Sequence, residues 1–338
     1  MNWTTLSLTD FDFLRKHLAA SVFMGSDCSL VNLFLLQKKY DTQTAIEGGF
    51  LFRYYAGAEN RTGYGFPLAL TVDGGTAQSL SDALSLIVAD AAANNRPVRF
   101  CLCDEMQKNA LNECMKVRFP ELALVWRTSR DDSDYIYERQ KLAALAGKTY
   151  HKKKNHVSRF LRAYEGNWEF RLLSLCRIDN DLILVAQQWL EEHFAAPPSP
   201  EMGTVAADAS DAPSAAARER ERHILQLELD SIRTAVQNKA DFALEGGVLY
   251  VHGVPVAMTL ASRIGDDVLD VHFEKCLASA AANGAYAAIN WCFANACDGV
   301  RYLNREEDMG VEGLRKAKLS YHPDLLVDKY YAFMESPC

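Results

Sequence analysis

The same order of predicted elements occurs twice along this chain, and this repeat limits the fold more than any other feature of the sequence. The first copy consists of a helix, two strand-like runs, a second helix and a strand, at residues 9–18, 49–55, 65–70, 79–94 and 97–103. The second copy consists of a helix, a two-stranded hairpin, a third strand and a second helix, at residues 182–193, 247–252, 254–261, 268–273 and from about 279. This order is typical of α/β sandwich domains. We therefore predict two mixed α/β domains that meet at a cleft.

The length of 338 residues is enough for two domains. We place the boundary after residue 146, so that the N-terminal domain covers 1–146 and the C-terminal domain covers 147–338. Residues 195–217 are rich in Ala, Pro, Ser and Asp and contain almost no large apolar side chain. Such a composition buries too little apolar surface to form a core, so this segment is predicted to be a mobile surface insertion in the second domain.

Charge and composition exclude several classes of protein. The chain has 36 basic and 44 acidic residues, a net charge of −8, which argues against a protein that coats nucleic acid over its whole surface. The N-terminus has no cationic and apolar signal, and the most apolar stretch, 277–296, is interrupted by three asparagines. We therefore predict a cytoplasmic protein without a transmembrane segment. The nine cysteines are scattered without a Cys-x-x-Cys motif, so no metal site is predicted, and the oligomeric state stays open.

Positive charge is concentrated in residues 148–165, which contain four Lys and two Arg against one Glu. On a helix, the apolar residues of this segment form one face and the basic residues follow one another along a different face. Lys and Arg on one face, with Asn and His as further donors, suit phosphate oxygens. The candidate substrate-binding residues here are Lys152, Lys153, Asn155, His156 and Arg159. A solvated cationic face that balances an acidic neighbour is the alternative.

A second polar cluster lies at 304–318, between a predicted strand and a predicted helix, where functional residues often collect. Its carboxylates and basic side chains could form a polar wall for a substrate that carries an amine and a phosphate. The candidates are Asp308 as a catalytic residue and Asn304, Arg305, Arg315, Lys316 and Lys318 as substrate-binding residues. In the structural alternative, Asp308 caps the helix and Arg305 pairs with Glu307.

The strand at 268–273 is followed by two further polar residues, so that the chain reads His272-Phe273-Glu274-Lys275 at its end. His272 or Glu274 could take a proton during catalysis, and both are candidate catalytic residues. For His272, the alternative is a capping role or a place in the core.

These segments occur in a recognisable order: Lys152-Lys153-Lys154-Asn155-His156, His272-Phe273-Glu274-Lys275, Gly284-Ala285-Tyr286, Asn304-Arg305-Glu306-Glu307-Asp308-Met309-Gly310 and Gly313-Leu314-Arg315-Lys316-Ala317-Lys318. Over nearly its whole length, the chain resembles a bacterial family of unknown function that is grouped with the C-terminal catalytic domain of phosphatidylglycerol lysyltransferase. The resemblance implies two tandem acetyltransferase-like (GNAT) folds with a cleft between them. In the characterised relatives, it implies transfer of an amino acid from aminoacyl-tRNA to a lipid headgroup.

Two features of the sequence depart from these relatives. The membrane-spanning flippase part of the lysyltransferase has no counterpart in this sequence, which leaves the acceptor open. Ordinary acetyltransferases carry Arg/Gln-x-x-Gly-x-Gly/Ala after the central strand, where backbone N–H groups bind the pyrophosphate of coenzyme A. Residues 281–286, Ala-Ala-Asn-Gly-Ala-Tyr, do not fit that pattern. Coenzyme A is therefore less expected than aminoacyl-tRNA, and no cofactor is assigned.

The leading functional prediction is an aminoacyltransferase that moves an amino acid from aminoacyl-tRNA to an unknown amine or hydroxyl of a small molecule or a lipid headgroup. The basic helix would hold phosphates of the acceptor stem, and it would face the same cleft as residues 304–318. Glu274 or Asp308 would accept the proton of the nucleophile, while Arg315 or Lys316 would stabilise the oxyanion. The alternatives are a coenzyme A-dependent N-acyltransferase and a non-catalytic GNAT-like module that binds a phosphorylated ligand or RNA.

Overall fold

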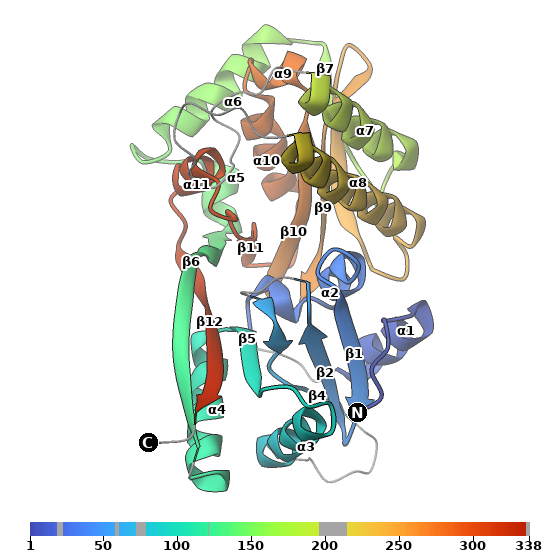
Figure 1. The fold of residues 1–338 in the computed structure, drawn as a ribbon. Helices are drawn as coiled ribbons and strands as arrows, with labels where there is room; N and C mark the ends of the chain where they lie inside the picture. The colour runs from blue at the N-terminus through green and yellow to red at the C-terminus, as the bar shows by residue number, and fades with distance from the viewer. Residues whose placement is uncertain (19–22, 58–60, 72–78, 121, 196–214, 336–338) are drawn as a thin grey trace. The chain divides into compact units, whose positions relative to one another are not determined.

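The structure is a computed structural model that describes residues 1–18, 23–57, 61–71, 79–120, 122–195 and 215–335 (Figure 1). It divides into two compact units. Unit 1 consists of Met1–Ser133 and Val327–Cys338, and unit 2 consists of Asp134–Leu326. Each unit combines helices with a mainly antiparallel set of strands, which confirms the predicted mixed α/β fold class.

The helices of unit 1 are α1 (Leu8–His17), the short 3-10 helix η1 (Ser26–Cys28), α2 (Leu30–Leu36), α3 (Leu80–Ala93) and α4 (Glu105–Arg118). Its strands are β1 (Thr42–Glu47), β2 (Phe50–Tyr55), β3 (Gly63–Tyr64), β4 (Leu68–Ala69) and β5 (Arg99–Cys103), together with parts of β6 (Ala123–Glu138) and β12 (Leu325–Glu335). Neighbouring strands follow the order β1-β2-β3-β5-β12-β6, and β4 pairs with β2. The pairing of β2 with β4 is the first predicted hairpin, with Leu51 opposite Leu68.

An apolar core joins the sheet of unit 1 to α3 and α4. On α3, the buried residues Ala83, Leu84, Ile87 and Ala91 recur at helical spacing and so lie on one face. Ser79 and Asp82 form a capping box that starts this helix, and a second box starts α4. The other side chains of the core include Phe50, Phe52, Tyr64, Phe100, Leu111 and Met115.

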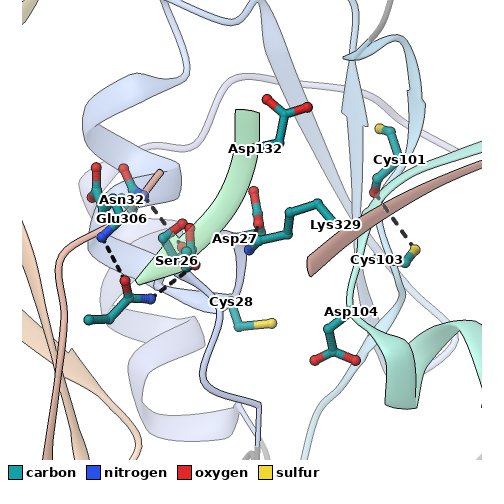
Figure 2. Close-up of polar contacts among 12 residues, drawn as sticks. Ser26, Asp27, Cys28, Asn32, Cys101, Cys103, Asp104, Asp132, Glu306 and Lys329 are labelled. Atoms are coloured by element: carbon teal, nitrogen blue, oxygen red, sulfur yellow. Dashed lines mark hydrogen bonds and ion pairs between the residues drawn. The ribbon is translucent and has the colours of Figure 1, made fainter. Parts of the chain in front are cut away.

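Polar contacts hold the part of β12 that belongs to unit 1, where this strand pairs antiparallel with β5. The Lys329 side chain is 2% exposed and its ammonium forms an ion pair with the carboxylate of Asp27, and Figure 2 shows these two side chains next to each other. The hydroxyl of Tyr331 donates to the carboxylate of Asp132, 2.6 Å away. The last strand therefore belongs to the first unit, whereas the sequence analysis assigned it to the second domain.

The division of the chain also differs from the predicted boundary after residue 146. It falls inside β6, between Ser133 and Asp134. The end of this 16-residue strand pairs with β11 of unit 2, with Glu138 opposite Tyr302. A strand that serves two units carries no Gly- or Pro-rich linker, so composition cannot place a boundary within it.

The helices of unit 2 are α5 (Arg139–Ala144), α6 (His151–Ala163), α7 (Asp179–Ala195), α8 (Ala215–Gln237), α9 (Ala278–Ala281), α10 (Ala285–Ala296) and α11 (Glu312–Leu319). Its own strands are β7 (Trp168–Leu172), β8 (Glu245–Val251), β9 (Val254–Ile264), β10 (Val268–Cys276) and β11 (Tyr302–Asn304), and they follow β6 in the order β11-β10-β9-β8-β7. Helices α7 and α8 lie alongside each other (Figure 1). Of the predicted insertion at 195–217, residues 196–214 lie outside the described residues, and 215–217 begin α8.

The hairpin predicted at 247–261 is confirmed as β8 and β9. His252 and Gly253 join the two strands with positive φ values of 51° and 74°, as a two-residue type I′ turn requires. Strand β10 pairs antiparallel with β9 and parallel with β11. Small and apolar side chains of α10 pack against β8, β9 and β10, which explains the Ala-rich composition of that helix.

Gly284 allows α10 to approach α6. Its φ is +94°, and an added Cβ would lie 2.4 Å from the carbonyl oxygen of His156 on α6. We expect Gly284→Ala to lower the free energy of unfolding by about 2 kcal/mol or more, because it adds a clash to a left-handed backbone conformation. Gly253→Ala is the matched control, since Gly253 has φ +74° with open space around its Cβ, and it should cost about 1 kcal/mol. Equal effects of both variants in urea unfolding would contradict the steric argument.

Candidate functional site

Strand β10 and the loop after β11 place two oppositely charged side chains together in unit 2. A guanidinium nitrogen of Arg305 lies 2.8 Å from a carboxylate oxygen of Glu274, and each side chain is 12% exposed. Burial lowers the pKa of Arg305, but Glu274 and the neighbouring tyrosines raise it above its ordinary value. The guanidinium therefore stays charged, and the pair presents a cation and a carboxylate side by side.

Helix α6 brings a third charged group to this pair. The ammonium nitrogen of Lys153 lies 3.8 Å from the ring centroid of Tyr321, and the guanidinium carbon of Arg305 lies 4.9 Å from the same centroid. Arg305 also lies 5.9 Å from the ring centroid of Tyr137. Burial and the charge of Arg305 lower the pKa of Lys153 to about 8, and Glu274 acts in the opposite direction. We call Lys153, Glu274, Arg305, Tyr137 and Tyr321 the Tyr321 site.

The Tyr321 site joins the two segments that the sequence analysis singled out separately. Lys153 comes from the predicted basic helix, and Arg305 comes from residues 304–318. Both cations pack on one aromatic ring, an arrangement that partly desolvated cations favour. That the two segments line a common cleft stays a prediction.

The remaining candidates on α6 are exposed. Lys152, Asn155, His156 and Arg159 face solvent, whereas Val157 and Phe160 are buried in the core of unit 2, as the amphipathic pattern predicts. A guanidinium nitrogen of Arg159 lies 2.6 Å from Nδ1 of His156. Burial lowers the pKa of His156, and Arg159 and Lys153 lower it further. The exposed face of α6 thus combines positive charge with a neutral imidazole next to the Tyr321 site.

Three of the candidate residues at 304–318 stabilise the loop between β11 and α11. The Lys318 ammonium is buried and donates to the carbonyl oxygens of Arg305 (2.6 Å), Glu306 (3.1 Å) and Glu307. The Asp308 carboxylate is fully buried and accepts two hydrogen bonds of 2.8 Å from Arg315. Burial raises the pKa of Asp308, but the hydrogen bonds from Arg315 and Tyr135 outweigh it and hold the pKa below its usual range. These contacts give Asp308, Arg315 and Lys318 a structural role in shaping the loop.

Asn304 and Lys316 contact residues other than those of the Tyr321 site. The buried Asn304 amide donates to Asp134 and its oxygen accepts from the backbone N–H of Glu306, so it anchors the start of the loop. The Lys316 ammonium is exposed on α11 and lies 2.6 Å from Glu312, one turn earlier in the same helix. These contacts do not support an oxyanion-stabilising role for Lys316.

His272 lies on β10 at a break in strand register. The pairing with β9 shifts between Val271 and Phe273, so that His272 has no opposite residue, and its Nε2 lies 2.7 Å from the hydroxyl of Ser262. Its Nδ1 lies 3.4 Å from a carboxylate oxygen of Asp270 and 3.4 Å from one of Glu306. Burial lowers the pKa of His272 to about 3, so the imidazole is neutral at pH 7. The ligand atoms of this group lie within 4.8 Å of one another, close enough to hold a metal ion.

Sequence reasoning missed several residues of unit 2 that the structure brings together. Tyr137 and Tyr321 line the Tyr321 site, but aromatic residues in a strand or after a helix carry no functional signal by themselves. Asp270 and Glu306 flank His272. Asp270 was detectable in principle, because Asp270, His272 and Glu274 are polar residues at every second position of a strand whose other residues, apart from Lys275, are apolar.

Among the described residues, no helix is both long enough and apolar enough to cross a membrane.

Most of the chain is similar to a known protein family. A family model described as phosphatidylglycerol lysyltransferase, C-terminal, matches residues 20–333. The chain belongs to this family. Membership of this family indicates a transferase. It does not determine the donor or the acceptor.

Several solved structures are similar to this chain. A conserved protein of unknown function from Bacteroides thetaiotaomicron is 28% identical, covers 99% of this chain and 100% of its own, and has a TM-score of 0.77. The C-terminal domain of a protein named as a lysylphosphatidylglycerol synthetase from Agrobacterium fabrum is 13% identical, with a TM-score of 0.57 over 97% of this chain and 92% of its own. A tandem GNAT protein from the clavulanic acid biosynthesis pathway is also among the similar structures, with 9% identity, a TM-score of 0.43 and coverage of 100% of this chain and 99% of its own. No curated protein matches the chain.

Proposed function

We propose that this protein transfers an amino acid from aminoacyl-tRNA to an amine or hydroxyl acceptor, with a lipid headgroup as the first acceptor to test. The observation that carries the proposal is the meeting of Lys153, Arg305 and Glu274 around Tyr321. Two cations suit the phosphates of a donor, and a carboxylate beside them suits an attacking nucleophile. Membership of the lysyltransferase family supports the same reaction class.

In the proposed reaction, the exposed basic face of α6 holds phosphates of the acceptor stem. Lys153 and Arg305 bind the terminal phosphate and orient the aminoacyl ester. The acceptor attacks the ester carbonyl and its proton passes to Glu274; when the ester C–O bond breaks, Glu274 returns this proton to the leaving ribose oxygen of the tRNA. Because an aminoacyl ester is already reactive, holding donor and acceptor in the right geometry supplies much of the acceleration.

A transfer assay tests this proposal directly. Radiolabelled aminoacyl-tRNA is mixed with the protein and with vesicles that contain phosphatidylglycerol, or with small soluble amines and alcohols, and label is followed into the lipid and soluble fractions. Label that reaches either acceptor supports the proposal. Transfer from radiolabelled acetyl-coenzyme A alone would replace it with the N-acyltransferase alternative. Binding of tRNA without transfer to any acceptor would favour a non-catalytic module.

The pKa of Lys153 predicts how binding depends on pH. At constant ionic strength, the affinity for an RNA minihelix ending in CCA should fall as the pH rises through about 8, because Lys153 then loses its charge. Between pH 7 and 9 its protonated fraction falls about tenfold, and the affinity should fall by up to that factor. Lys153→Arg should keep its affinity to pH 9, since a guanidinium stays charged. A wild-type affinity that does not change with pH would show that the Lys153 ammonium does not bind a phosphate.

The exposed residues of α6 make a separate prediction about salt. Lys152→Glu together with Arg159→Glu should weaken minihelix binding and reduce the slope of log Kd against log salt by about 2, because each lost phosphate contact releases about one counterion fewer. Fluorescence anisotropy at several salt concentrations measures this slope. An unchanged slope would show that the basic face is only a solvated helix surface.

A further inference from the structure

We infer that Asp270, His272 and Glu306 form a site for a divalent transition-metal ion, for which Zn²⁺ is the best match. The inference is independent of the proposed transfer reaction. Asp270 and His272 lie on β10, and Glu306 lies in the loop after β11, so strand pairing brings the three side chains together. The spacing of Cys and His along the sequence predicts no such site, because the ligands come from two distant segments.

The distances fit one ion. Nδ1 of His272 lies 3.4 Å from a carboxylate oxygen of each partner, and all three ligand atoms lie within 4.8 Å of one another. Ligand atoms about 2.1 Å from a tetrahedral ion are about 3.4 Å apart, and the two distances from His272 have this value, so small side-chain shifts suffice to close the three atoms around one ion. Three protein ligands leave a fourth position for water or substrate.

The orientation of His272 is the second, independent observation. Its side chain is 1% exposed, and Nδ1 makes no hydrogen bond within the described structure, although it points between two carboxylates. Nε2 is occupied by the hydroxyl of Ser262 at 2.7 Å. A second-shell contact of this kind fixes the ring and leaves the other nitrogen for a metal. A metal ion at this position would take Nδ1 and the two carboxylate oxygens as its ligands.

The surrounding charge also favours a cation. The negatively charged carboxylates of Asp270, Glu307 and Asp134 all repel the carboxylate of Glu306, and the Lys318 ammonium offsets part of this repulsion. Imidazole with carboxylates suits zinc better than magnesium or calcium, which prefer oxygen ligands alone. Glu306 is 20% exposed while Asp270 is fully buried, so an ion has an entry point on the Glu306 side.

Zinc binding to the full chain tests the inference without any transfer substrate. After treatment with a chelator, isothermal titration with Zn²⁺ should give one tight site per chain. Asp270→Asn and His272→Gln should each weaken it at least 100-fold. Ser262→Ala should weaken it about tenfold, as for a residue that positions a ligand. The matched control is His193→Gln, because His193 lies 3.1 Å from the carboxylate of Glu221 and is the kind of His–carboxylate pair that binds zinc adventitiously.

Two further measurements keep the test decisive. Co²⁺ bound at this site should show ligand-field bands without a thiolate charge-transfer band, which separates it from binding to the free cysteines. If Asp270→Asn does not fold by circular dichroism, Glu306→Gln at the exposed edge replaces it. A thiolate band, the absence of a tight site in the wild-type chain, or tight binding that survives in folded His272→Gln would each overturn the inference. Because no tRNA or acceptor is present, failure here leaves the proposed transfer reaction unaffected.

Discussion

Replacing Glu274 by Gln should lower the rate of aminoacyl transfer by about a hundredfold or more, because an amide cannot accept the proton of the nucleophile. The affinity for the RNA minihelix should change by about twofold at most, since Lys153 and Arg305 still bind the phosphates. The pattern to look for in single-turnover kinetics is therefore a large loss of rate with nearly unchanged donor binding.

Glu245→Gln is the matched control for Glu274→Gln. Glu245 also pairs with an arginine of unit 2, Arg263, at 3.0 Å, and it lies outside the Tyr321 site. The control should keep the wild-type rate within about twofold, which separates the loss of a reacting group from the loss of an ion pair. A Glu274→Gln variant that is folded and as fast as the control would rule out Glu274 as the proton acceptor.

Replacing Lys329 by Met should lower the free energy of unfolding by about 3 kcal/mol, because it removes one partner of a buried ion pair and takes the ammonium away from the Asp27 carboxylate. The Lys329 side chain is 2% exposed and that of Asp27 is 17% exposed, so water cannot fully replace the lost ammonium. Unfolding by urea, followed by tryptophan fluorescence and circular dichroism, measures the change.

Lys316→Met serves as the comparison for Lys329→Met. The Lys316 side chain is 73% exposed, and its ammonium lies 2.6 Å from the carboxylate of Glu312, one turn earlier in the same helix. An exposed pair of this kind contributes little, so its loss should change the free energy of unfolding by about 0.5 kcal/mol or less. Similar effects of the two substitutions would mean that the Asp27–Lys329 pair does not hold the last strand in unit 1.

Local patterns predicted the elements whose partners are close in sequence. The β8–β9 hairpin follows from two apolar runs and a two-residue turn with Gly253, and α6 follows from the spacing of Val157 and Phe160. In both cases, the information lies within about 15 neighbouring residues, which is the range over which turn chemistry and helical periodicity act.

Strands that depend on distant partners were missed. β12 begins at Leu325 and pairs with β5, and β6 contains a polar run from Arg127 to Asp134 that does not read as a strand. Such residues become extended because partner strands satisfy their backbone groups, not because of their own propensity. The division between the two compact units lies inside β6, where no local pattern marks it, for the same reason.

By itself, the sequence determined the mixed α/β class and the segments where charge gathers, because composition, turn residues and helical spacing are local properties. Only the tertiary structure decided what each charged residue does. It places Lys153, Glu274 and Arg305 around one tyrosine ring. Asp308 instead accepts hydrogen bonds from Arg315, and Lys318 donates to three backbone carbonyls. The physical reason is that a charged side chain acts through its partners and its burial, and both depend on residues that are distant in the sequence.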